Sequence, residues 1–141
     1  ARVACRTASA QGAAGVLIAP LVAMREGDVP IIRRSAQLER RAAISIVSVV
    51  ELEGGVPVAR EGARLRRAKL DGLFDVVEIL PFNWADAQIY RRIVEQAGFS
   101  RRLIIDRMIA AQAIVVGATL ATLNPRDFRD IPDLMIDNWS R

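Results

Sequence analysis

Short runs of branched apolar residues alternate along the chain with segments of helical periodicity, and this alternation strongly restricts the possible folds. The apolar runs cover residues 16–19, 43–47, 76–80, 118–123 and 134–136, and the helical segments cover residues 30–41, 48–53, 60–74, 85–97 and 103–116. Strands that are separated by helices normally pair in parallel, with helices on both faces of the sheet. The sequence therefore predicts an α/β protein with a central, mostly parallel sheet.

The length of 141 residues corresponds to one ordinary domain. Residues 1–14 are rich in Ala, Gly, Ser and Thr and lack periodicity, so we expect an atypical, disordered segment there and a single domain over residues 15–141. The longest apolar run, residues 15–24, is interrupted by Pro20. A membrane span needs about 20 apolar residues, so we expect no association with a membrane.

The composition excludes several classes of function. The chain has no histidine, which excludes Ser-His-Asp triads, Cys-His proteases and histidine-based zinc sites. A single cysteine, Cys5, excludes an internal disulfide and favours a reducing, cytoplasmic compartment. Lys and Arg outnumber Asp and Glu by 20 to 16, with short arginine pairs such as Arg101-Arg102. This excess is a weak argument for a polyanionic partner, because solvated helix faces are its more ordinary explanation.

Three acidic residues follow expected strands or begin expected helices. Glu51 lies in a short helix that we expect Ser48 to cap, Asp106 lies near the start of the 103–116 helix, and Asp127 follows the fourth strand. Ligand sites of parallel sheets form where the strands end, so these acids are expected to converge. Carboxylates in such a cluster suit Mg²⁺, which polarises a phosphodiester and lowers the pKa of its bound water.

Each acid also has a purely structural explanation. Glu51 and Asp106 would interact favourably with the dipoles of their helices, and Asp127 would cap the turn before Phe128. Asp106 has the strongest case for function, because its apolar neighbours predict burial and a buried charge needs a partner or a metal.

Three stretches resemble PIN-domain proteins of the VapC toxin type. They are residues 44–56, residues 106–113 with the pattern D-x-x-I-A-A-x-A, and residues 117–128 followed by Ile131-Pro132 and Asn138-Trp139. The resemblance implies a three-layer α/β/α sandwich. It also implies a Mg²⁺- or Mn²⁺-dependent endoribonuclease of a toxin–antitoxin pair, which cleaves RNA, is neutralised by an antitoxin protein and often forms a homodimer.

The resemblance assigns roles to particular residues. Glu51 matches the second acid of the family site and Asp106 the third. Asn124 matches the fourth position, with Asp127 just beyond it, and Thr122 matches a hydroxyl of the motif that would orient a water. In an active enzyme, Arg101 and Arg102 at the mouth of the Asp106 helix would hold the RNA backbone.

The start of the sequence departs from the family. The first strand of relatives ends in Asp followed by Thr and Asn, and this sequence has no such triplet. Two alignments place the first acid near Leu17 or near Ala13, and neither is acidic. Three hypotheses follow: a ribonuclease toxin, a catalytically impaired PIN-like module that acts only through its antitoxin, and a structural α/β domain whose acids are all caps.

Overall fold

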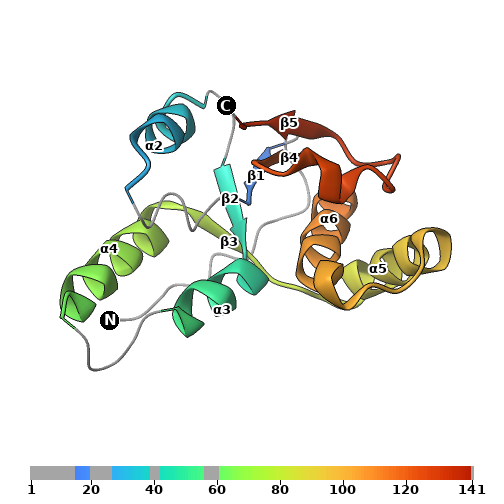
Figure 1. Ribbon diagram of the computed structural model, residues 1–141, viewed down its shortest axis with the longest axis horizontal. Coiled ribbons are helices and arrows are strands. Elements are labelled where there is room, and N and C mark those ends of the chain that lie inside the picture. Colours follow the sequence, from blue (N-terminus) through green and yellow to red (C-terminus); the bar gives the residue numbers. More distant parts are fainter. Residues whose placement is uncertain (1–14, 20–26, 39–41, 56–60, 141) are drawn as a thin grey trace.

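The computed structural model describes residues 15–19, 27–38, 42–55 and 61–140 (Figure 1). Residues 1–14, for which we expect an atypical segment, lie outside this part of the chain. The elements in chain order are β1 (Val16–Ile18), α2 (Val29–Ala36), β2 (Ala42–Ser45), α3 (Ile46–Gly54), α4 (Ala63–Val76), β3 (Glu78–Leu80), α5 (Trp84–Ala97), η1 (Arg101–Leu103), α6 (Ile104–Val116), β4 (Thr119–Thr122), η2 (Pro125–Phe128) and β5 (Ile136–Asn138). No helix of the described residues is long and apolar enough to cross a membrane.

The five strands form one parallel sheet in the order β3-β2-β1-β4-β5. The predicted central parallel sheet is therefore confirmed. The strand β1 lies in the middle, where Leu17 pairs with Ala43 of β2 and with Leu120 of β4. Because all strands run in the same direction, their carboxyl ends share one edge, from which α3 and η2 follow directly.

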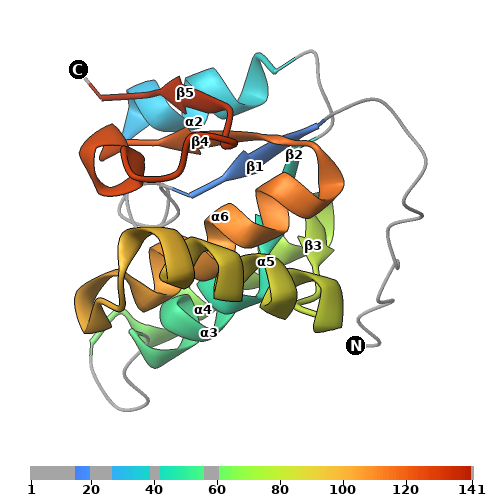
Figure 2. The same ribbon diagram turned by 90° about the vertical axis from the view of Figure 1, so that its right-hand side faces the viewer.

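Helices pack on both faces of this sheet, as Figures 1 and 2 show. On one face, Leu17 and Leu120 pack against α5 and α6, for example against Ile93 and Ile109. On the other face, neighbouring residues of β1, β2 and β4 pack against α2, α3 and α4; they include Val16, Ile18, Ile44 and Ala121. The strand period of two sends successive side chains to opposite layers, so each strand contributes to both cores. The arrangement confirms the three-layer sandwich.

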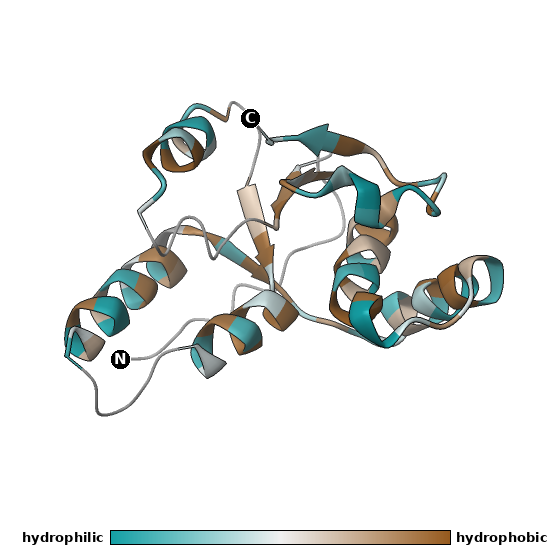
Figure 3. Ribbon diagram, viewed as in Figure 1, coloured by the Kyte–Doolittle hydropathy of each residue, from teal (hydrophilic) through white to brown (hydrophobic). Residues whose placement is uncertain are grey.

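The helices carry apolar and polar stripes (Figure 3), as expected for helices that cover a sheet. The helix α5 begins at a capping box, in which the Asn83 side chain accepts from the Asp86 amide at 3.3 Å and Asp86 Oδ2 accepts from the Asn83 amide at 2.7 Å. At its other end, Arg107 of α6 donates from Nη1 to the Gly98 carbonyl. These bonds satisfy backbone groups at both ends of α5.

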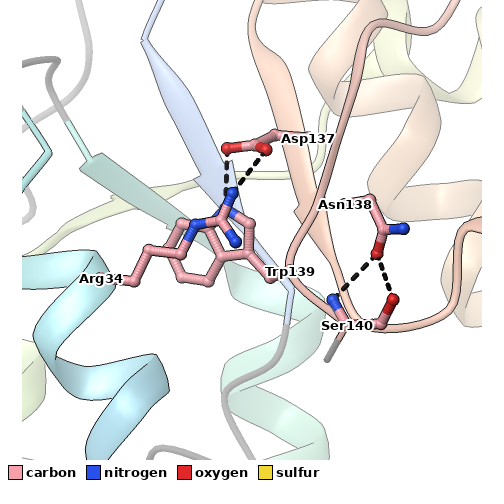
Figure 4. Close-up of polar contacts among 5 residues, drawn as sticks. All are labelled: Arg34, Asp137, Asn138, Trp139 and Ser140. Carbon is pink, nitrogen blue, oxygen red and sulfur yellow. Dashed lines mark hydrogen bonds and ion pairs between the residues drawn. The ribbon is translucent and has the colours of Figure 1, made fainter.

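The helix α2 is linked by polar contacts to β5, the strand at one edge of the sheet (Figure 4). Arg34 donates from Nη2 to Asp137 Oδ1 at 2.9 Å, and its guanidinium lies 5.1 Å from the centre of the Trp139 ring. Trp139 Nε1 donates to the second oxygen of Asp137 at 2.8 Å. One carboxylate thus links α2 to the end of β5, although the two are separated by about a hundred residues of sequence.

Two element boundaries differ from the sequence prediction in a way that matters for the site. The second strand ends at Ser45, and Ile46 and Val47 already belong to α3. The cap of α3 is therefore Ser45, whose Oγ accepts from the Val47 amide at 3.0 Å, and not Ser48, which is buried inside the helix. The local β propensity of Ile46 and Val47 is overridden because the cap starts the helix earlier. Likewise, the last strand covers 136–138 rather than 134–136.

Candidate active site

Glu51 and Asp106 lie on neighbouring helices that pack against each other, α3 and α6. Glu51 follows the carboxyl end of β2 by six residues, and Asp106 lies in the first turn of α6. Partial burial raises the pKa of the Glu51 carboxyl, and the negative charge of Asp106 raises it further. The tertiary structure therefore brings together the two acids for which the sequence predicts a joint site.

Asp106 also interacts electrostatically with Asp127. Burial is the largest cause of the raised pKa of Asp106, the charge of Asp127 adds to it, and the Arg102 guanidinium opposes it. Asp106 thus interacts electrostatically with both other acids, since its charge also acts on Glu51. The pKa values of the Glu51 and Asp106 carboxyls are both raised, and a nearby cation would favour the charged form of each.

Asp127 has a cationic partner within the chain. Arg102 donates from Nη1 to Asp127 Oδ1 at 3.1 Å, which joins η1 to η2. The Arg102 side chain remains 70% exposed, and Arg101 beside it is exposed as well. Arg102 therefore lies beside Asp127 and is open to solvent, and Arg101 is exposed on the same short turn, η1.

Thr122 and Asn124 shape the turn that follows β4. Thr122 is buried, and its Oγ1 accepts from the Asn124 backbone amide at 3.0 Å. The Thr122 hydroxyl thus orients the backbone that enters η2, and its predicted role with a water stays a prediction. The Asn124 side chain is exposed after the strand end, close in sequence to Asp127.

The middle strand supplies no acid to the edge where the site lies. The strand β1 ends at Ile18, and the amide of the next residue, Ala19, donates to the Ala121 carbonyl at 3.0 Å. Leu17, near which one alignment placed the first acid, is fully buried within the strand and does not lie at its carboxyl end. Ala13, the alternative, lies outside the described residues. The structural position at the carboxyl end of β1, beside β2 and β4, is that of Ala19.

The donor set suits a weakly held Mg²⁺ or Mn²⁺ ion. Over the ranges that the structure describes, no three acidic or cysteine side chains come close enough together to enclose a metal. Mg²⁺, however, commonly takes only one or two protein carboxylates and completes its shell with waters and substrate phosphates. Glu51, exposed on α3, and Asp106, half-buried on α6, are the two carboxylates that could meet that requirement.

Two buried polar residues, Ser45 and Gln112, have no role in the sequence prediction. Ser45 Oγ donates to Gln112 Oε1, and Gln112 Nε2 donates to the carbonyls of Leu80 and Pro81 at 3.2 and 3.0 Å. The sequence does place Gln112 on the inner face of its helix, and a polar residue there is a signal for a buried hydrogen-bond network.

Comparison with known proteins supports the fold and the family. The PIN domain family model matches residues 14–134. Ribonuclease VapC of Rickettsia bellii is 36% identical over 61 residues, which cover 41% of this chain. That match spans 45% of the relative's own length.

Solved toxin–antitoxin structures share the architecture. The structure of VapBC2 from Rickettsia felis bound to a promoter DNA fragment has a TM-score of 0.74, with 27% identity over 89% of this chain and 98% of that one. DNA-bound VapBC from Salmonella typhimurium has a TM-score of 0.75, with 21% identity and the same coverage. With the family model matching most of its residues, the chain belongs to the PIN domain family and resembles the VapC toxins within it.

Proposed function

We propose that this chain is the ribonuclease toxin of a toxin–antitoxin pair and hydrolyses RNA phosphodiesters with the help of Mg²⁺ or Mn²⁺. The observation that carries the proposal is the packing of α3 against α6, the helices that bear Glu51 and Asp106, in a PIN fold. The proposal treats residues 15–141 as one domain. The name of the Rickettsia bellii relative, Ribonuclease VapC, supports the choice of reaction.

The chain's own residues would bind and orient the substrate. Glu51 and Asp106 would hold the cation, which supplies a polarised phosphoryl oxygen and a bound water of lowered pKa. Arg101 and Arg102 would hold the flanking phosphates through charge-assisted hydrogen bonds. Asp127 and Asn124 would complete the coordination shell of the cation through bridging waters. For this, Asp127 would give up its hydrogen bond with Arg102.

An antitoxin is the proposed protein partner, because the similar solved structures are VapBC complexes. The family resemblance implies an amphipathic helix or extended tail on the apolar helices and an arginine that reaches the acidic group. On the described surface, α3 exposes Ile46 and Val50 on the helix that carries Glu51. A homodimer of the toxin belongs to the same proposal.

A second function is favoured by the residue at the carboxyl end of β1. Ala19 offers no ligand where an acid would face Glu51 and Asp106, so the cation would be held by fewer charges. Metal affinity falls with the number of charged ligands. The alternative is therefore a PIN-like module with impaired catalysis that acts only through its antitoxin.

The decisive experiment measures cleavage of a structured RNA pool with and without Mn²⁺. The wild type is compared with Glu51→Gln and Asp106→Asn, and with Ala19→Asp, which adds a carboxylate at the end of β1. Cleavage that requires Mn²⁺ and is lost in the first two variants supports the ribonuclease. A folded wild type without cleavage, together with cleavage gained by Ala19→Asp, supports the impaired module. No cleavage by any variant would overturn the ribonuclease proposal.

A further inference from the structure

Gln112 is a buried polar side chain on α6. It is 1% exposed and lies between Ala111 and Ala113, both fully buried on α6. A buried amide is unfavourable unless all its polar groups are paired, and a Leu or Met would fill the same space without that requirement. Its presence needs a reason beyond packing.

The amide joins three segments that are distant in sequence. Its oxygen accepts from Ser45 at the end of β2, and its nitrogen donates to the carbonyls of Leu80 and Pro81 at the end of β3. The Ser45 hydroxyl also accepts from the Val47 amide, so it caps α3 and binds α6 at the same time. The direction in which α3 leaves the sheet is therefore set by a bond to α6.

The two candidate metal ligands lie at equal sequence distance from this junction. Glu51 follows Ser45 by six residues, and Asp106 precedes Gln112 by six. Six helical residues span about 9 Å, so a tilt of about 5° at the junction would displace either acid by about 0.8 Å. Ligand groups must be held within about 0.5 Å of their working positions. A small change of angle at the junction is thus enough to move Glu51 and Asp106 out of the spacing that a shared cation would need.

We propose that Gln112 is a positioning residue that acts through Ser45: its hydrogen bonds fix the angle between α3 and α6 and so set the spacing of Glu51 and Asp106. The part of this inference that concerns the cation rests on the proposed function. The part that concerns the helix angle does not, because it follows from the hydrogen bonds alone.

The test replaces Gln112 with Met, which keeps the volume and removes the hydrogen bonds. Residual dipolar couplings of backbone amides in the full chain measure the angle between α3 and α6 without metal. Titration with MnCl₂ measures affinity for the metal alone, and RNA cleavage gives kcat and KM separately. Ile109→Val is the matched control, because Ile109 lies on the same helix and in the same core but makes no polar contact through its side chain.

We expect Gln112→Met to change the helix angle and to weaken Mn²⁺ binding by at least about 10-fold, as for other residues that orient metal ligands. It should lower kcat while KM for RNA stays within about twofold, because Arg101 and Arg102 are untouched. Ile109→Val should change none of these quantities. Should Gln112→Met fail to fold, Ser45→Ala removes the same bond from its other end and is expected to change the angle in the same direction.

An unchanged helix angle in the folded variant would overturn the proposal. If the wild type binds Mn²⁺, a variant with a changed helix angle but an unchanged Mn²⁺ affinity would also overturn the proposal. If the wild type itself neither binds Mn²⁺ nor cleaves RNA, the proposed function fails, and the helix angle alone then decides the role of Gln112. In the double variant, Ser45→Ala should add little to Gln112→Met with respect to the angle, because both remove one interaction.

Discussion

Arg102 donates a hydrogen bond to Asp127 at 3.1 Å across 25 residues of sequence, and its charge also acts on Asp106. The guanidinium therefore lies next to Asp127 and acts on two acids of the candidate site. Its positive charge offsets part of the repulsion between the Asp106 and Asp127 carboxylates. The same side chain is 70% exposed, so it can leave Asp127 for an incoming phosphate at little cost.

The first prediction concerns Arg102→Gln. Loss of the positive charge should raise the pKa of the Asp106 carboxyl further, because Arg102 is the group that lowers it. The free energy of unfolding should change by less than about 1 kcal/mol, as for other exposed ion pairs. The pKa is measured by NMR titration of the carboxyl carbon. Arg91→Gln, which breaks an exposed pair with Glu95 on α5, is the control and should leave the Asp106 pKa unchanged.

The second prediction concerns RNA affinity at different salt concentrations. Replacing both Arg101 and Arg102 by Gln should reduce the slope of log K against log salt by about 1.4, since each contact with a single strand contributes about 0.7. Binding is measured in EDTA, so that no cleavage intervenes. Arg91→Gln again serves as the control. A slope equal to that of the wild type would show that these arginines do not contact the phosphates.

The third prediction concerns stability and pH. The pKa of Asp106 is raised above its ordinary value of 3.8, so the folded state binds protons more tightly than the unfolded state. The wild type therefore loses stability as the pH rises from about 4 through the folded pKa. Asp106→Asn removes this loss and should be more stable than the wild type at pH 7, on the order of 0.5 kcal/mol because solvent screens a half-exposed group.

Urea denaturation of both proteins between about pH 4 and pH 7 checks this sign. The advantage of Asp106→Asn should grow with pH and vanish near the lower limit. A variant that is less stable than the wild type at pH 7 would contradict the electrostatic account, since it would mean that the carboxylate stabilises the metal-free fold.

The fourth prediction concerns the link between α2 and β5. Asp137→Ala should lower the free energy of unfolding by about 1–3 kcal/mol, because it leaves the indole N–H of the buried Trp139 without its acceptor. Arg34→Met should lower the free energy of unfolding by less, because the ion pair between Arg34 and Asp137 is exposed. A double-mutant cycle measures the coupling. Additive effects of the two changes would contradict a shared link through Asp137.

The fifth prediction concerns the start of α5. Asp86→Ala removes the acceptor for the Asn83 amide and should destabilise the protein by about 1 kcal/mol. Glu95→Ala on the same helix is the control, because its pair with Arg91 is exposed and should cost only a few tenths of a kcal/mol. Equal effects of both substitutions would exclude a specific role for the capping box.

Much of the fold followed from local patterns in the sequence. Alternation of strands and helices predicted the parallel sheet, and the regions of all five strands were located to within a few residues. The boundary between β2 and α3 was misplaced, because Ile46 and Val47 have β propensity and only the bond between Ser45 and α6 shows where the helix begins.

The candidate site was predicted in composition but not in arrangement. Glu51 and Asp106 are separated by 55 residues, and their coupling depends on how α3 packs against α6. No pattern along the chain predicted the ion pair between Arg102 and Asp127, since it depends on the path of two short turns, η1 and η2. The position at the end of β1 was also left open by the sequence, because apolar residues alone do not show which of them is the last in a buried strand.

The sequence by itself thus determined which elements form and which chemistry is possible, since propensity, periodicity and the choice of side chains are local properties. Only the tertiary structure decided which polar groups meet. The sequence places Gln112 on the inner face of a helix, but only the structure shows that its side chain bonds to Ser45, Leu80 and Pro81. Contacts of this kind depend on the relative orientation of whole elements, and that orientation is fixed by the two packed cores together.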